Sequence, residues 1–268
     1  MEGQMRFRPL NEDHAIESVK FSVAFSAGIL GPSIMAVEQG HSLWRDSLPA
    51  RSIADVSVES NGRSGSAPGV LFSFLRPDGL PSWSMAVAVN RIDIECSLYS
   101  RWERVWAEAR GYFVKVIEIL SKSQPGLEIG AVELTVKDVF LATERDYPLN
   151  QLLKPSVRLP KFIFEAGQAW HANSGWFEVE ANGMQRTLHN LNCDATPDDE
   201  LTVINISHYQ QGGMTSPVNI SANRAQLPET LEQRMSTLHK ANKQLMVDIL
   251  KDDMANRIGL GAANNVDI

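Results

Sequence analysis

Apolar and polar residues alternate along several stretches of the first hundred positions of the chain. This period of two is clearest in "IESVKFSVAF" and recurs further on, at residues 16–25, 53–58, 70–75, 82–89 and 92–99. Because successive side chains on a strand point to opposite faces, the pattern predicts the strands of a half-buried antiparallel sheet. Pro77, Asp78 and Gly79 form a turn signal between the third and fourth strands. Residues 33–43 read as a short helix.

A different spacing, of three and four residues between apolar side chains, follows in "SRWERVWAEARGYFVKVIEIL". It predicts a long amphipathic helix that ends at residues 124–126 and begins with an S-x-x-E capping box made of Ser100 and Glu103. Its apolar stripe carries four aromatic rings, those of Trp102, Trp106, Tyr112 and Phe113. We interpret these rings as core that covers a sheet, with a stacking platform or cofactor site as the alternative.

The second half of the chain repeats this order of elements without visible sequence identity to the first. Strands are expected at 127–142, 161–165, 176–181, 185–193 and 201–209, with a short helical piece near 149–153 and a long helix at 228–250. Each half therefore reads as a strand, a short helix, four strands and a long helix.

This order predicts an α+β fold of two pseudo-repeated modules, each a curved antiparallel sheet with a long helix packed on one face. The modules would span residues 1–125 and 126–258, and a mobile tail would follow at 259–268. Tandem TATA-protein-like and helix-grip modules share this layout, and they often bind ligands or partners on the exposed face.

Composition places the chain among ordinary globular proteins, since 43% of its 268 residues are hydrophobic and 21% are charged. The formal net charge of −7 argues against a generic nucleic-acid binder, which needs surplus Lys and Arg, and against binding to anionic membranes. The longest uncharged run, "FSVAFSAGILGPSIMAV", is interrupted by Gly31 and Pro32 and is too short for a membrane span. We therefore predict no transmembrane segment and no nucleic-acid partner.

The remaining motifs point to a cytoplasmic protein without a cofactor. Cys96 and Cys193 form no C-x-x-C pair, so neither a zinc ribbon nor a disulfide framework is predicted. The residues "MEGQMRFRPLNEDH" lack the apolar core of a secretory signal. P-loop, dinucleotide-binding, HExxH and GxSxG motifs are missing, and "GRSGS" lies in a Gly- and Ser-rich stretch, 60–69, that reads as a flexible loop.

Histidines in the second half form the best chemical candidate. His189 and Cys193 belong to one predicted strand and His208 to the next. One hairpin register places the two histidines opposite each other, whereas a shift by one residue puts them on opposite faces. With Asp194 they could bind zinc, although their spacing matches no known ligand pattern. Packed or solvated histidines are therefore our interpretation, and a metal site at His189, Cys193 and His208 is the alternative.

A long polar stretch, "YQQGGMTSPVNISANR", occupies residues 209–224 and reads as a loop. Long loops without secondary structure are often functional, so we expect partner or ligand contacts there. "HANSGW" adds an Asn-Ser-Gly turn between aromatic residues, which would line the rim of the same site. The expected contact residues are Tyr209, Gln210, Gln211, Arg224, His171 and Trp176.

Three further segments carry a family resemblance: "RPLNEDHAIESVKFSVAF", "FSFLRPDGLPSWSMAVAVNRIDIECSLYSRWERVWAEA" and "IGAVELTVKDVF". They resemble a sporadically distributed family of uncharacterised bacterial proteins of similar length. In the third segment family members usually carry a Tyr and an Asn, where this chain has Val136 and Asp138. The resemblance implies a sensor component beside a separate effector in a two-gene anti-phage defence system, and it carries over no catalytic residues.

We therefore expect a non-enzymatic recognition or sensor subunit that acts through a protein partner, either the product of a neighbouring gene or a phage component. The sequence leaves open whether the chain forms a homo-oligomer. The alternative is a hydrolase or small-molecule-binding enzyme that uses His171, His189 and His208. Nucleic-acid binding through the sheet face is a third hypothesis, which the net charge disfavours.

Overall fold

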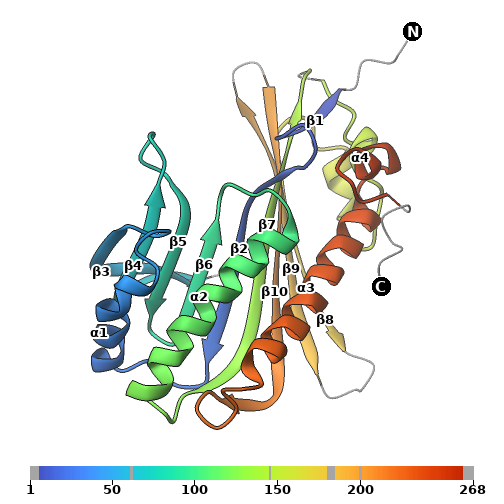
Figure 1. Cartoon of the computed structure of the whole chain (residues 1–268). Helices are drawn as coiled ribbons and strands as arrows, with labels where there is room; N and C mark the ends of the chain where they lie inside the picture. The colour runs from blue at the N-terminus through green and yellow to red at the C-terminus, as the bar shows by residue number, and fades with distance from the viewer. Residues whose placement is uncertain (1–5, 61–62, 145, 180–184, 199–200, 262–268) are drawn as a thin grey trace.

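One antiparallel sheet organises the chain (Figure 1). The computed structural model describes residues 6–60, 63–144, 146–179, 185–198 and 201–261. Within them the fold is α+β, as predicted, because ten strands form a single sheet and helices pack on one of its faces. No helix of this described part is long and apolar enough to span a membrane.

Two similar series of elements follow each other along the chain. The first consists of β1 (Phe7–Pro9), β2 (Ile16–Phe25), α1 (Gly31–Gln39), β3 (Ala50–Ser60), β4 (Arg63–Leu75), β5 (Pro81–Ala88), β6 (Arg91–Cys96) and α2 (Trp102–Ser123). The second consists of β7 (Glu128–Ala142), two 3-10 turns (Leu149–Gln151 and Lys161–Phe164), β8 (Trp170–Val179), β9 (Arg186–Asp198), β10 (Leu201–Asn219), α3 (Leu227–Ile249) and α4 (Asp252–Arg257).

The first long strand of each series lies at the centre of the sheet. The strand order is β3-β4-β5-β6-β2-β7-β10-β9-β8, and the short β1 pairs with the end of β7. In each half the first long strand therefore pairs with the last one, β2 with β6 and β7 with β10. α2 and α3 lie side by side on one face (Figure 1). The opposite face carries none of the described helices, and we call it the helix-free face.

Two apolar clusters fill the space between the sheet and the helices. The larger lies under α2 and the first half of α3 and includes Phe21, Ile92 and Phe113. The smaller lies under the second half of α3 and includes Phe140 and Ile249. Each buried side chain of this size stabilises the fold by roughly 1.5–3 kcal/mol.

A polar layer separates these clusters. His208 and Gln210 of β10 and Asn242 of α3 are all buried there. Leu238 belongs to the larger cluster and Leu245 to the smaller one, so the layer lies midway along α3. One helix therefore spans both clusters and the polar residues between them.

The aromatic rings of α2 belong to the core, as predicted. Trp106, Tyr112 and Phe113 are buried. Trp102 is partly buried and stacks on His239 of α3, with ring centroids 3.6 Å apart and planes within 4° of parallel. Nε1 of Trp106 also donates a hydrogen bond to Glu232 of α3. Two of the rings thus join the long helices to each other.

Two predicted details of local structure are wrong. α2 begins at Trp102 after Arg101, and no side-chain hydrogen bond caps it, because Ser100 lies one residue before the cap position. The predicted strand at 161–165 is a 3-10 turn in which only Ile163 is buried, so it lacks the buried face of a strand. The second series accordingly has three strands after its short helical piece.

Two stretches predicted as loops are strands. The Gly- and Ser-rich stretch belongs to β4 from Arg63 onward and pairs with β3. The polar stretch that begins at Tyr209 continues β10 as far as Asn219, and it pairs with β7. A Cβ atom on Gly212 would lie 3.4 Å from Cδ2 of Leu238, an ordinary van der Waals distance, so α3 packs directly over this strand.

Candidate functional site

Small and polar side chains cover the helix-free face. Because alternate residues of each strand point toward the helices, the register aligns the remaining ones in rows across the sheet. One row crosses six neighbouring strands and consists of Asn190, Tyr209, Thr135, Lys20, Glu95 and Ser84. A face of this composition suits polar contacts, and its amides and hydroxyls can both donate and accept hydrogen bonds.

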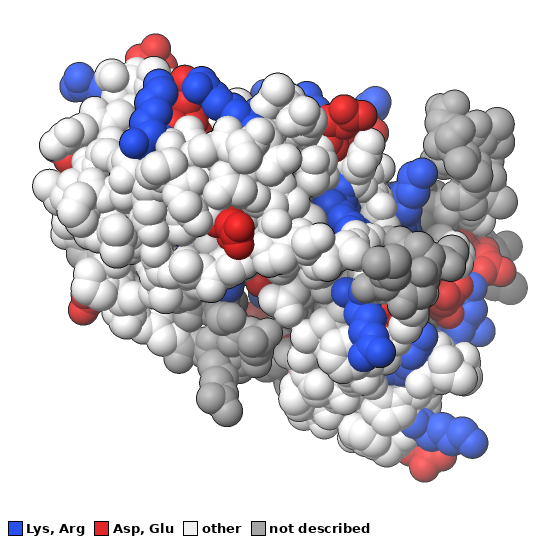
Figure 2. All heavy atoms as spheres, turned by 90° about the horizontal axis from the view of Figure 1, so that it is seen from below, with Lys and Arg blue, Asp and Glu red and all other residues white. Residues whose placement is uncertain are grey.

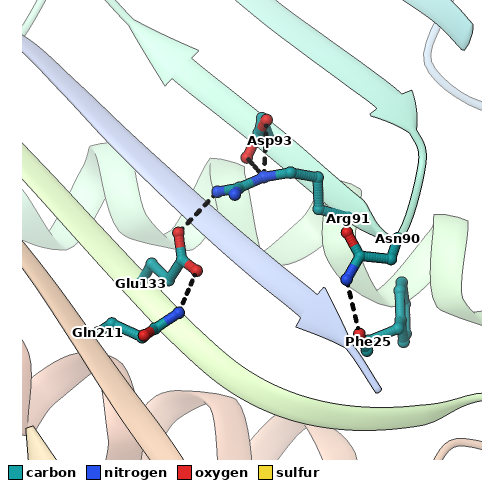
Figure 3. A network of polar contacts seen from close by, with 6 residues as sticks. All are labelled: Phe25, Asn90, Arg91, Asp93, Glu133 and Gln211. Atoms are coloured by element: carbon teal, nitrogen blue, oxygen red, sulfur yellow. Dashed lines mark hydrogen bonds and ion pairs between the residues drawn. The ribbon is translucent and has the colours of Figure 1, made fainter. Parts of the chain in front are cut away.

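A charged network lies in the middle of this face (Figure 3). Arg91 of β6 donates from Nε to both carboxylate oxygens of Asp93, at 2.9 and 3.1 Å, and from Nη2 to Glu133 of β7 at 2.6 Å. Glu133 also accepts a 2.9 Å hydrogen bond from Gln211 of β10. β2 lies between β6 and β7, and its small Ser22 at the level of Asp93 and Glu133 leaves room for the guanidinium to cross.

This network is buried although no described helix covers it. The side chains of Arg91 and Glu133 are only 3% and 2% exposed. Burial by itself would lower the pKa of Arg91, but the nearby Asp93 and Glu133 carboxylates raise it above the ordinary value. The network therefore ties β6, β7 and β10 together across β2 and supports the face rigidly.

A hollow of about 620 Å³ opens on the same face, in the N-terminal half. Its floor includes Ser18 of β2, Ser84 of β5 and Glu95 of β6. Its walls come from the β1–β2 connection, the β4–β5 hairpin and the link from β6 to α2. A volume of this size is within the range of ordinary ligand sites, about 300–1,000 Å³.

Three exposed leucines, here called the leucine rim, line this hollow, one from each of the three connections. Leu10 is 38% exposed, Leu80 57% and Leu98 64%. Single exposed apolar residues are common, but apolar side chains gathered around a concave site mark interaction surfaces. The hollow and its leucine rim are therefore the candidate functional site.

The structure divides the six predicted contact residues among separate places. His171, Tyr209 and Gln211 lie on the helix-free face, where Nε2 of His171 is 2.6 Å from the side-chain oxygen of Asn192. His171 and Trp176 belong to β8 rather than to a turn.

The other three contact residues lie elsewhere. Gln210 is fully buried in the polar layer, and Trp176 stacks on His189 on the helix side of the sheet. Arg224 lies before α3 and pairs with Glu118 of α2 at 2.5 Å. None of the six lines the hollow. One signal in the sequence could have indicated the hollow, namely an apolar residue beside a turn. Leu80, directly after Pro-Asp-Gly, is such a residue.

The structure brings two of the predicted histidines into contact. His189 pairs in register with Gln210, and His208 with Leu191, so the histidines meet diagonally rather than directly opposite. Nδ1 of His189 lies 3.1 Å from Nε2 of His208, whose Nδ1 lies 2.8 Å from Oδ1 of Asn242. The buried pair thus joins β9 and β10 to α3.

Cys193, the third member of the predicted metal set, is not part of this pair, and neither is His171 of the predicted enzymatic group. His171 lies on the other face of the sheet, hydrogen-bonded as described. Burial, followed by the nearby Asp194 carboxylate, raises the pKa of the Cys193 thiol to about 12. Among the described residues no group of three or more His, Cys, Asp or Glu side chains could hold a metal ion.

The histidine pair should make stability depend on pH. Burial lowers the pKa of His208 to about 3, so the unfolded chain binds more protons than the native one as the pH falls below about 6.5. The contribution of His208 to the free energy of unfolding is therefore fully present above about pH 6.5. It decreases as the pH falls toward the pKa of the folded state, about 3. Relative to His208→Gln, the wild type should lose about 2 kcal/mol of unfolding free energy between about pH 7 and pH 5.

Urea unfolding of both proteins at the two pH values measures this difference. His171→Gln is the control, because the same substitution is made on an exposed side chain. A difference between wild type and His208→Gln that stays constant with pH would contradict the prediction.

Comparisons with known proteins add little to this geometry. No protein-family model matches the chain. No curated protein matches it either. Among solved structures, the di-domain ARO/CYC StfQ from the steffimycin biosynthetic pathway is 10% identical in sequence, and the match covers 85% of this chain and 96% of that one. Its TM-score of 0.21 is too low to indicate a shared fold.

Proposed function

We propose that this chain is a non-enzymatic recognition protein that binds a protein partner through the hollow and its leucine rim. The observation that carries the proposal is the convergence of three exposed leucines around a 620 Å³ hollow on a face that the described helices leave open. Covering exposed apolar side chains around a concavity with a partner lowers the free energy. A partner segment with an aliphatic side chain would fill the hollow and leave polar groups to meet the hydroxyls of the floor.

Charge argues for a protein rather than a nucleic acid. The lining of the hollow includes two carboxylates, Glu17 and Glu95, and one guanidinium, Arg76, which already pairs with Asp78 at 3.3 Å, so it carries no surplus of positive charge to neutralise a phosphate. Viewed from below, the molecule shows Lys and Arg side chains scattered between wide uncharged areas, with Asp and Glu among them (Figure 2). The overall net charge is −7. Phosphate binding would require a continuous basic stripe.

The two halves would be two versions of one module, residues 1–125 and 126–258. The strand order supports this, because each half starts at the centre of the sheet and returns to pair with its own first strand. The hollow belongs to the first module and the histidine pair to the second. Each module would therefore carry its own specialised group on a shared framework, an open hollow in the first and a buried histidine pair in the second.

The resemblance to the defence-associated bacterial family supports a more specific role. In this role the chain would be the cytoplasmic sensor of a two-gene anti-phage system. Its partner would be the effector encoded by the neighbouring gene or a phage component. Burial of the leucine rim by one of these partners would be the recognition event.

Substitution of the leucine rim tests the proposal. The double variant Leu80→Lys with Leu98→Lys should reduce partner recovery at least about 30-fold, the effect of losing a 2 kcal/mol hot spot. Leu43→Lys is the matched control, because Leu43 is 51% exposed but lies outside the hollow. Tagged proteins would be recovered from the host with and without phage infection, and bound proteins would be quantified by mass spectrometry.

Recovery of one protein in near-equal amounts by the wild type and Leu43→Lys, but not by the double variant, is the expected result. Equal recovery by all three would contradict the site. Recovery of the chain alone, or robust turnover of a substrate that His208→Gln abolishes, would overturn the proposed function in favour of the enzymatic alternative.

A further inference from the structure

β8 forms an open edge of the sheet. It pairs with β9 on one side, and no described strand pairs with its other side. Its ten residues, "WHANSGWFEV", include one acidic side chain, no Lys or Arg, and no proline. Natural edge strands are usually protected by charges, proline, bulges or short length, because their free backbone groups would otherwise pair with another strand.

The opposite edge of the sheet is protected in this way. β3 carries the exposed Arg51, which pairs with Glu38 of α1 at 2.6 Å, and the exposed Asp55. Charges on an edge oppose pairing because a second strand would have to desolvate them. The two edges of the sheet therefore differ, and β8 carries fewer charges that would oppose pairing with another strand.

Exposed apolar side chains lie on the same end of β8. Phe177 is 67% exposed and Val179 53% exposed. Gly175 precedes Phe177 by two residues, so all three occupy the helix-free side of the strand. A Cβ atom on Gly175 would have the carbonyl oxygen of His189, at 3.7 Å, as its closest neighbour, so the space above this glycine is open.

We infer that residues 175–179, the last five of β8, pair antiparallel with the same five residues of a second copy of this chain, in a register centred on Phe177. The two Phe177 rings then lie side by side across the two-fold axis. Val179 of each copy covers Gly175 of the other, and Glu178 of each copy lies opposite Trp176 of the other. The result is one sheet that continues through both molecules.

The residues of β8 favour a second copy of this chain as the pairing partner. In this register the glycine gap of one copy receives the exposed valine of the other, and the single acidic residue never meets itself. Aromatic cross-strand pairs and filled glycine positions both stabilise antiparallel pairing. A two-fold axis makes the contact self-complementary, so it closes at a dimer and does not propagate.

The oligomeric state of the full chain tests the inference. Size-exclusion chromatography with light scattering should give twice the chain mass of 29.7 kDa. Phe177→Lys should raise the dimer dissociation constant at least about tenfold. Val114→Lys is the control, because Val114 is an exposed apolar residue of α2, away from the edge, and this variant should stay dimeric. Circular dichroism confirms that both variants are folded.

Oxidative cross-linking with diamide tests the register. Phe177→Cys should form a disulfide with its own copy, whereas Gly175→Cys, which lies opposite position 179, should not. The native Cys96 and Cys193 are buried and leave this readout clean. A wild type that stays monomeric at about 100 μM, or equal cross-linking of the two variants, would overturn the inference. The leucine-rim double variant should remain dimeric, so this result is independent of the proposed function.

Discussion

Glu133→Ala should lower the free energy of unfolding by about 3–5 kcal/mol, the usual cost of removing one member of a buried ion pair. Arg91 is 3% exposed, and its Nη2 would lose its 2.6 Å partner while its charge stayed buried. Gln211 would lose the acceptor of its hydrogen bond at the same time. Urea unfolding of the variant and the wild type at neutral pH measures the loss.

Two further variants separate the buried charge from a general effect of truncation. Glu17→Ala removes a carboxylate from the exposed pair with Lys137 and should cost less than about 1 kcal/mol. The triple variant Arg91→Met, Asp93→Asn and Glu133→Leu removes all three charges of the network and should recover most of the stability. Equal losses for Glu133→Ala and Glu17→Ala would show that the network contributes no more than a surface pair.

Asp138→Asn should stabilise the protein, and the gain should grow with pH. Asp138 is 4% exposed in β7, and burial raises the pKa of its carboxyl to about 7. Between about pH 4 and pH 7 the native state therefore binds more protons than the unfolded state, so its stability falls as the pH rises. A neutral amide of the same shape avoids this penalty, which amounts to about 2–4 kcal/mol above pH 7.

Unfolding measurements at pH 4, pH 6 and pH 8 test this expectation. The variant and the wild type should be nearly equal at the lowest pH and differ most at the highest. Asp194→Asn is the control, because Asp194 already accepts a hydrogen bond from Asn205 on the helix-free face. A stabilisation that does not change with pH would refute the role of the buried carboxyl.

Short-range patterns allowed much of the fold to be predicted. Alternation in "IESVKFSVAF" identified β2, and the apolar stripe from Trp102 to Leu120 identified α2, because both depend on neighbours along the chain. The end of β10 could not be found in this way. Its Gly212 suggests a loop, and it becomes a strand because it pairs with Val132 of β7, which is distant in sequence.

The candidate site is formed by residues that lie even further apart in the sequence. Leu10, Leu80 and Leu98 are ordinary apolar residues beside turns, and only the strand order brings their three connections together. The contact between the two histidines was not predicted, because the two registers considered place them either directly opposite each other or on opposite faces of the sheet. Alternation places His189 and His208 on one face, but their diagonal contact depends on where the β9–β10 hairpin turns.

The polar layer under α3 has a consequence for motion within the molecule. Two apolar surfaces can slide past each other by a helical turn, about 5.4 Å, and still bury similar area. Asn242 can reach His208 at one position only, so such a slide would strand buried polar groups without partners. The contact between Asn242 and His208 therefore opposes a slide of α3 along the sheet.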